Sequence, residues 1–304
     1  MNLLNKFFHK QGELILNKPA FAYAMVFLFA GLPFLTWVSV SIVAFLTLRL
    51  GPITGLKALG VSVLSILLSN YLVSSLSLMT LVAIFFTIFP LFFAAWILRI
   101  TASWNMVAIF LVLLTSITVI YAHFILPAFL MEEYNTLLNL LNTFQKNGAQ
   151  LKSWLENKEQ VINYILGIQA VFFLLSSLMS LMIARAFQAK LFYPAGFKQE
   201  MLHFQASMFM LLPFALLLVG FYYHVSLSFS LLPTWILYFC AAGMSVLICL
   251  FAAHRSLLVF SLLIIAVSML PLFIFPLVVS IGVLDSFLNF RQRFKKHKSG
   301  ADSS

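Results

Sequence analysis

Residues 161–184 read VINYILGIQAVFFLLSSLMSLMIA, and none of them carries a charged side chain. A helix needs about 20 mostly apolar residues to cross the hydrocarbon core of a membrane. The alternation of apolar and polar residues that marks a membrane β-strand is missing from this stretch. It therefore predicts a transmembrane α-helix.

Further apolar runs follow the same pattern along the chain. They occupy residues 21–48, 57–78, 80–98, 104–128, 205–223, 232–252 and 256–288. Of all residues, 63% are hydrophobic and 9% are charged, whereas soluble domains are about 45–50% apolar and about 25% charged. The sequence predicts an all-α fold, a polytopic transmembrane bundle of roughly 8–10 helices that forms one domain over residues 1–304.

Lysine and arginine set the expected orientation, because these residues concentrate in cytoplasmic loops. The segment 185–203 and the basic tail 289–304 are rich in them, and so is the N-terminus, so all three are expected in the cytoplasm. The loop 130–160 carries four Glu against three Lys and is expected outside the membrane. The net charge of +10 thus reflects membrane topology and contact with the lipid bilayer, and no nucleic-acid partner is expected.

Both terminal runs conflict with this orientation unless each is broken. The run 21–48 has basic flanks on both sides, and Gly31-Leu32-Pro33 offers a turn for a hairpin of two short helices. The run 256–288 poses the same problem and contains Pro271 and Pro276. The alternative for each is one long, kinked span.

The loop 130–160 has its own helical pattern. Apolar residues recur at helical spacing from Leu130 to Phe144, Gly148 interrupts, and the pattern resumes from Leu151 to Leu155. We expect two short amphipathic helices on the outer membrane surface.

Chemistry-bearing residues are scarce. No carboxylate lies at the centre of a run; Asp285 comes nearest and is expected to be structural, within reach of Arg291. The chain has no zinc, nucleophile-elbow or P-loop signature. The sequence therefore predicts no enzyme, no metal and no cofactor, and any uphill transport would need an energising partner.

Two groups of residues are candidates for binding. Polar residues in the outer halves of the runs are expected either to line a solute pocket or merely to mark the membrane interface. They are Asn70, His123, Asn163, Gln169, His224 and Trp235. Ala20 and Ala24 form a small-residue face that suits helix packing, either within the chain or against a partner.

Three stretches resemble the YybS-like family of uncharacterised bacterial inner-membrane proteins. They are GLPFLTW (31–37) continuing to TLRLGP (47–52), RAFQAKLFYPAGFKQE (185–200) and GVLDSFLNFR (282–291). The family pattern has two glycines before Phe197, and Ala195 replaces one of them here. The resemblance runs nearly end to end and implies a location in the bacterial inner membrane.

The stretch Gly51-Pro52-Ile53-Thr54-Gly55 is similar to the start of the third helix in S components of energy-coupling-factor vitamin transporters. That resemblance implies two short preceding helices, with Ala20 and Ala24 in the position of a face that docks an energising ATPase module.

The function that we expect is small-solute binding from outside with partner-driven transport. The alternative is a membrane scaffold that docks a cytoplasmic partner through 185–203 and the tail. In that segment Arg185, Pro194, Gly196 and Phe197 are the candidate docking residues.

Overall fold

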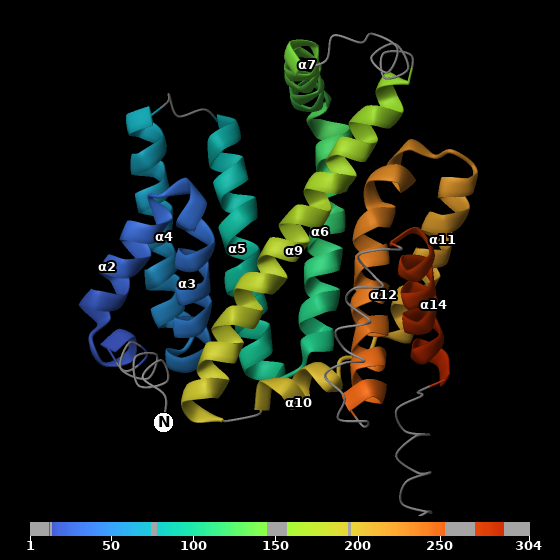
Figure 1. Ribbon diagram of the computed structural model, residues 1–304. Helices are drawn as coiled ribbons and strands as arrows, with labels where there is room; N and C mark the ends of the chain where they lie inside the picture. Colours follow the sequence, from blue (N-terminus) through green and yellow to red (C-terminus); the bar gives the residue numbers. More distant parts are fainter. Residues whose placement is uncertain are drawn as a thin grey trace, which may run out of the picture. The chain divides into compact units, whose positions relative to one another are not determined.

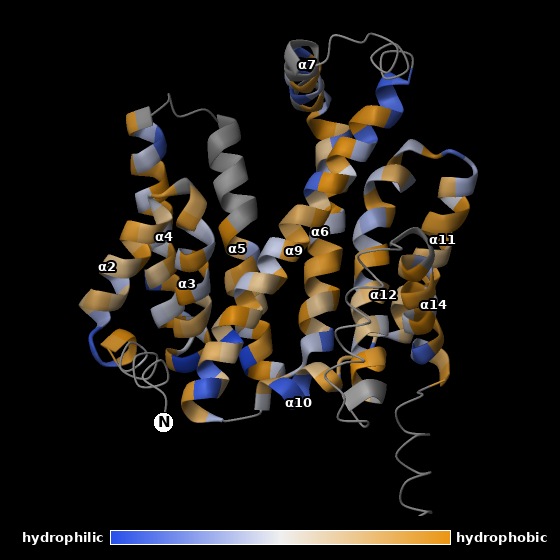
Figure 2. Cartoon of the chain, viewed as in Figure 1, coloured by the Kyte–Doolittle hydropathy of each residue, from blue (hydrophilic) through white to orange (hydrophobic). Residues whose placement is uncertain are grey.

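The computed structural model describes residues 12, 14–73, 78–144, 157–193, 196–252 and 271–288. All regular structure in these residues is helical (Figure 1). Four of the described helices are long and apolar enough to cross a membrane: Pro52–Leu72, Trp104–Ile125, Lys158–Phe192 and Ser226–Cys249. Figure 2 shows apolar residues along these helices and hydrophilic residues toward the ends of α9 (Lys158–Phe192). The prediction of an all-α, polytopic membrane protein is confirmed.

The chain divides into two compact units. The first comprises residues 1–111 and 173–201, and the second comprises residues 112–172 and 202–304. Among the described helices, α6 (Trp104–Ile125) and α9 contribute residues to both units, and the last residue of the short helix at 196–202 belongs to the second unit while the rest of that helix belongs to the first. The expectation of a single domain over the whole chain stays a prediction.

The first unit starts with the predicted break in the run 21–48. Helix α2 (Pro19–Ala30) ends at Gly31, the short 3-10 helix η1 (Pro33–Leu35) follows, and α3 (Thr36–Leu50) continues from it. Pro33 fixes its own φ and disfavours helix at Leu32, whose backbone is extended. The two short helices pack against each other and against α4 (Pro52–Val73) (Figure 1). The predicted hairpin break is confirmed.

Hydroxyl groups join these three helices at close range. Ser39 of α3 donates to the carbonyl oxygen of Val26 at 2.9 Å and lies 3.3 Å from the hydroxyl of Ser62. Ser65 of α4 donates to the carbonyl of Phe27 at 2.5 Å. Small side chains let helix backbones approach closely in a membrane, where hydrophobic attraction between helices is weak.

The Gly-Pro-x-x-Gly stretch makes the turn from α3 to α4. Gly51 has a φ of 110°, a left-handed value that glycine adopts readily, and Pro52 opens α4. A Cβ at Gly55 would collide with the hydroxyl of Thr47, so glycine is required for the close approach of α4 to α3. Helix α5 (Leu78–Thr101) completes this packing against both α3 and α4.

Helix α9 extends further than the sequence predicted. Its 35 residues span about 52 Å at about 1.5 Å per residue, whereas a membrane core is about 30 Å thick. Residues 185–192, which follow the predicted span 161–184, form the last turns of α9, and α10 (Gly196–Leu202) follows. The positive charge of Arg185 marks the end of the apolar run, but the helix continues beyond it to Phe192.

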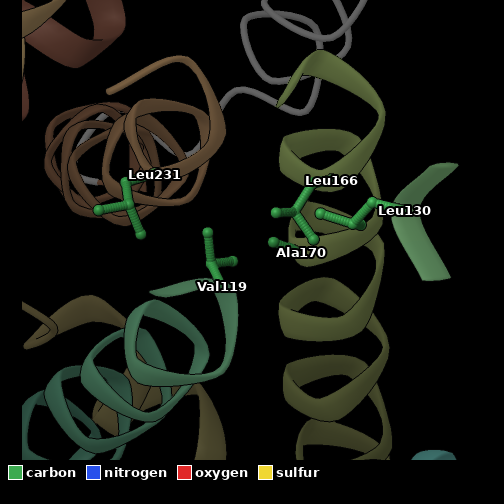
Figure 3. Packing of buried hydrophobic residues seen from close by; sticks show 5 residues of the cluster. All are labelled: Val119, Leu130, Leu166, Ala170 and Leu231. Atoms are coloured by element: carbon green, nitrogen blue, oxygen red, sulfur yellow. The ribbon is translucent and has the colours of Figure 1, made fainter. Parts of the chain in front are cut away.

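In the second unit, α7 (Pro127–Phe144) is the first of the two amphipathic helices predicted for 130–160. It buries Leu130 and Tyr134 and leaves Glu132 exposed. The second predicted helix lies outside the described residues. Figure 3 shows where α6, α7, α9 and α12 (Ser226–Ala252) meet in a small apolar cluster. Its members are Val119, Leu130, Leu166, Ala170 and Leu231.

The second unit also contains the short helices η2 (Met208–Met210) and α11 (Leu211–Tyr222), and α14 (Pro271–Leu288). Helices α12 and α14 cross at two glycines. A Cβ at Gly243 would collide with the carbonyl of Val278, and a Cβ at Gly282 would collide with that of Phe239. Pro271 begins α14 and Pro276 lies inside this helix, so Pro276 does not end it. The expected break of the run 256–288 stays a prediction, because residues 253–270 lie outside the described residues.

Candidate functional site

The end of α9 and the short helix α10 are joined in the first unit by an ion pair between Arg185 and Glu200. Arg185 Nε donates to Glu200 Oε2 at 3.0 Å, and Arg185 Nη2 donates to Glu200 Oε1. Arg185 Nη1 donates to Gln188 Oε1 at 2.6 Å. This two-pronged pairing uses the planar fork of arginine and fixes orientation as well as distance. We call the group Trp104, Arg185, Gln188, Phe197 and Glu200 the α10 corner.

Trp104, at the first position of α6, closes the α10 corner. Its indole Nε1 donates to Glu200 Oε2 at 2.9 Å, and its ring packs edge-on against Phe197 with 6.0 Å between centroids. Glu200 thereby accepts hydrogen bonds from residues of two helices. The short helix α10 is held to α6 and α9 by both polar and aromatic contacts.

The electrostatics of the corner favour a charged Glu200. Burial raises the pKa of the Glu200 carboxyl, but hydrogen bonds from Arg185 and Trp104 and the charge of Arg185 outweigh it. The pKa of Glu200 consequently lies below its usual value. The ion pair is therefore formed at neutral pH.

The corner contains two of the four docking residues that the sequence suggested in this segment, and a third lies beside it. Arg185 belongs to the ion pair, Phe197 contacts Trp104, and Gly196 begins α10. Pro194 lies outside the described residues. Sequence reasoning missed Trp104 and Gln188, because no spacing signal links a tryptophan to a glutamate 96 residues away.

The Ala20–Ala24 face of α2 is exposed. The buried face of the same helix is formed by Ala22, Val26 and Ala30, which are at most 3% exposed. The chain's own packing therefore uses a different stripe of α2, and the interpretation of Ala20 and Ala24 as an internal packing face is not supported.

The predicted pocket residues have individual partners inside their own units. Trp235 is buried and donates from Nε1 to the hydroxyl of Ser116 at 3.0 Å. Gln169 donates to Glu133 at 2.8 Å, and both residues lie at the α7–α9 packing. Asn70, in the first unit, donates to the carbonyl of Ile66 in its own helix at 2.9 Å.

The two histidines of that set make ring contacts. His224 follows α11 with a left-handed φ of 57° and stacks on Phe229, with 6.2 Å between centroids. His123 lies edge-on to its neighbour Phe124. Pocket formation by these residues stays a prediction.

A polar ladder between α9 and α12 went partly unnoticed in the sequence. Buried Asn163 accepts from Ser230 at 3.0 Å, and one turn earlier Glu159 accepts from Ser226 at 2.8 Å. A Cβ at Gly167 would press on backbone atoms of Phe229 and Ser230. The four-residue spacing on each helix keeps these contacts in register.

Asp285 is more deeply placed than the sequence suggested. Its side chain is fully buried in α14, and its backbone carbonyl accepts from Gln205 at 2.9 Å. The proposed partner Arg291 lies outside the described residues. The structural role expected for Asp285 stays a prediction.

Metal ligation finds no support in the described part of the chain, where no three His, Cys, Asp or Glu residues gather around a common point. Comparisons with protein-family models, with curated proteins and with solved structures gave no significant match.

Proposed function

We propose that this protein is a solute-binding subunit of the bacterial inner membrane that depends on an energising partner for transport. The observation that carries the proposal is the exposed Ala20–Ala24 face of α2, whose opposite stripe is already buried. Small-xxx-small faces allow close helix-to-helix contact in membranes. A second protein with a complementary helix would fit on this face.

The surroundings of α2 support the same proposal. Helices α2 and α3 are too short for ordinary spans, with 12 and 15 residues, against the roughly 20 that a span requires. Serine-to-carbonyl contacts join α2 to α3 and to α4. A short helix that is fixed on one side offers its other side at a defined height in the membrane, as docking to a rigid partner requires.

The alternative function is a membrane scaffold, and the α10 corner favours it. The corner's ion pair holds α10 in place, while Lys198 and Gln199 on the same short helix are exposed. A cytoplasmic protein could bind to this rigid, polar helix without any transport of a solute.

Copurification distinguishes the two functions. The tagged chain is extracted from its native membrane in mild detergent, and its partners are identified by mass spectrometry. An ATPase module supports transport, whereas a soluble assembly without ATPase supports the scaffold. Ala20→Leu with Ala24→Leu should release the ATPase module, because the added side chains prevent close helix contact.

Gly60→Leu is the matched control for this experiment. Gly60 lies exposed on α4 with open space around its Cβ position, so a leucine side chain is added there without a collision. Retention of the ATPase by the double alanine variant would contradict docking through α2. Absence of any copurifying protein would contradict both functions.

A further inference from the structure

Two arginines from different helices lie at the end of α3 in the first unit. Arg99 of α5 donates from Nη1 to the carbonyls of Thr47 and Leu48, at 3.0 and 3.2 Å. These carbonyls belong to the last turn of α3, and that of Thr47 also accepts from the backbone N–H of Gly51 at 3.2 Å. Arg49 stands in the same turn, one residue beyond Leu48.

Each arginine is held in place by part of its guanidinium group only. The Arg49 guanidinium carbon lies 3.9 Å from the centroid of the Phe192 ring. Stacking on a ring engages the face of the group and leaves its N–H edges available, and an arginine has five N–H donors. Both Arg49 and Arg99 are exposed, so donors remain for a ligand at the end of α3.

The local charge balance favours an anion. Among the described residues of the first unit, Glu200 is the carboxylate, and it is bound by Arg185. Lys57, exposed near the start of α4, adds positive charge after the Gly51 turn. An anionic group of a ligand would therefore be attracted to the end of α3 by these positive charges. No described carboxylate of this unit competes with it for Arg49 or Arg99.

Exposed apolar side chains beside the arginines identify the class of anion. Leu50 follows Arg49 and is 44% exposed, Ile100 follows Arg99 and is 68% exposed, and Ile53 is 73% exposed. A free phosphate ion would gain nothing from these side chains. A phospholipid would place its acyl chains against them and its phosphate on the guanidinium groups.

We propose that Arg49 and Arg99 form a binding site for the headgroup of an anionic phospholipid, with Leu50, Ile53 and Ile100 contacting its chains. The site is independent of the proposed transport function. It would fix the height of the α2–α3–α4 group in the membrane, because Arg99 joins the lipid to the end of α3.

The test measures lipid retention by native mass spectrometry of the full chain, with dioleoylphosphatidylglycerol as the probe and dioleoylphosphatidylcholine for comparison. Arg49→Gln should lower retention of the anionic lipid about fivefold, the factor expected for one interfacial cation. Arg49→Lys should retain most of the binding. Arg49 is changed rather than Arg99 because the latter also caps α3.

Lys158→Gln is the matched control, since it removes an exposed cation from the second unit at the start of α9. If Arg49→Gln fails to fold, Phe192→Leu removes the ring that positions Arg49 without changing the charge and should give a smaller loss.

Unchanged retention in both Arg49→Gln and Phe192→Leu would overturn the site. An equal loss of anionic-lipid retention in Lys158→Gln would also overturn the site. Equal retention of the anionic and the zwitterionic lipid by the wild type would overturn it as well. Competition by inorganic phosphate, beyond that of chloride at the same ionic strength, would indicate a free-anion site and overturn the lipid assignment.

Discussion

The two units bring membrane helices close together by different means. In the first unit, Ser39 and Ser65 donate to backbone carbonyls across the α2, α3 and α4 contacts. In the second, Gly243 and Gly282 let the backbones of α12 and α14 touch with no side chain between them. The serine contacts add a hydrogen bond and tolerate adjustment. The glycine crossing depends on shape alone, so it should tolerate substitution less.

The two units also differ in the surroundings of one carboxyl group in each. Glu200 in the first unit lies at a helix end, partly exposed, and pairs with Arg185 and Trp104. Asp285 in the second unit is fully buried inside a helix. A partly exposed ion pair contributes modestly to stability and responds to pH, whereas a fully buried carboxyl group depends on the groups packed around it.

The largest effect is expected at the glycine crossing. Gly282→Ala would push a methyl group into the carbonyl of Phe239, and neither backbone can move without displacing its helix. We expect a loss of roughly 3 kcal/mol, the upper part of the range for overpacked cores. Thermal unfolding of the purified protein in detergent measures the loss.

Gly60→Ala is the control for that substitution. Open space surrounds the Cβ position of Gly60, so alanine should be neutral or raise stability by about 0.5–1 kcal/mol through its better helix propensity. If Gly282→Ala were as harmless as Gly60→Ala, the glycine crossing would not be a rigid contact.

The second prediction concerns the ion pair of the α10 corner. Glu200→Gln removes the charge that Arg185 and Trp104 bind, and it should cost about 1–2 kcal/mol at neutral pH. Because the folded-state pKa of Glu200 is lowered, its contribution is complete above the unfolded pKa. The contribution disappears as the pH falls through the lower, folded value.

Unfolding of the wild type and of Glu200→Gln at a series of pH values tests this sign. The difference between their melting temperatures should be constant near neutrality and shrink below the ordinary glutamate pKa of about 4.3. A difference that grows on acidification would contradict the assignment of Glu200 as a charged partner.

These two predictions rest on contacts that the sequence could not supply. Apolar length located the four helices that are long enough to span a membrane, and Gly31-Leu32-Pro33 indicated the break after α2, because both signals are local. Trp104 and its partner Glu200 are far apart in the chain, and so are Gly243 and Gly282. The residues next to one partner in the sequence give no indication of the other. The helical continuation through Arg185 was missed because cationic residues mark membrane borders, and helices often extend past them.

A third prediction separates the two contacts of Trp104. Trp104→Phe keeps an aromatic ring against Phe197 but removes the indole donor to Glu200. We expect a loss of about 1 kcal/mol, typical of one hydrogen bond. A double-mutant cycle with Glu200→Gln measures the coupling, which should account for most of that loss. No coupling would mean that Trp104 acts by packing alone.

The smallest effect is expected at the serine contacts of the first unit. Ser39→Ala removes the hydroxyl that donates to the carbonyl of Val26, while the methyl group still fits between α2 and α3. Hydrogen bonds between membrane helices contribute about 0.6 kcal/mol on average, because the separated helices also find partners. Thermal unfolding should detect a loss of that size, well below that of Gly282→Ala.

Ser280→Ala is the control, since this exposed hydroxyl donates to the carbonyl of Pro276 in its own helix, and its removal should lower stability little. A loss at Ser39 as large as at Gly282 would erase the difference between the two units, and would mean that hydroxyl contacts constrain α2 and α3 as strictly as glycine constrains α12 and α14.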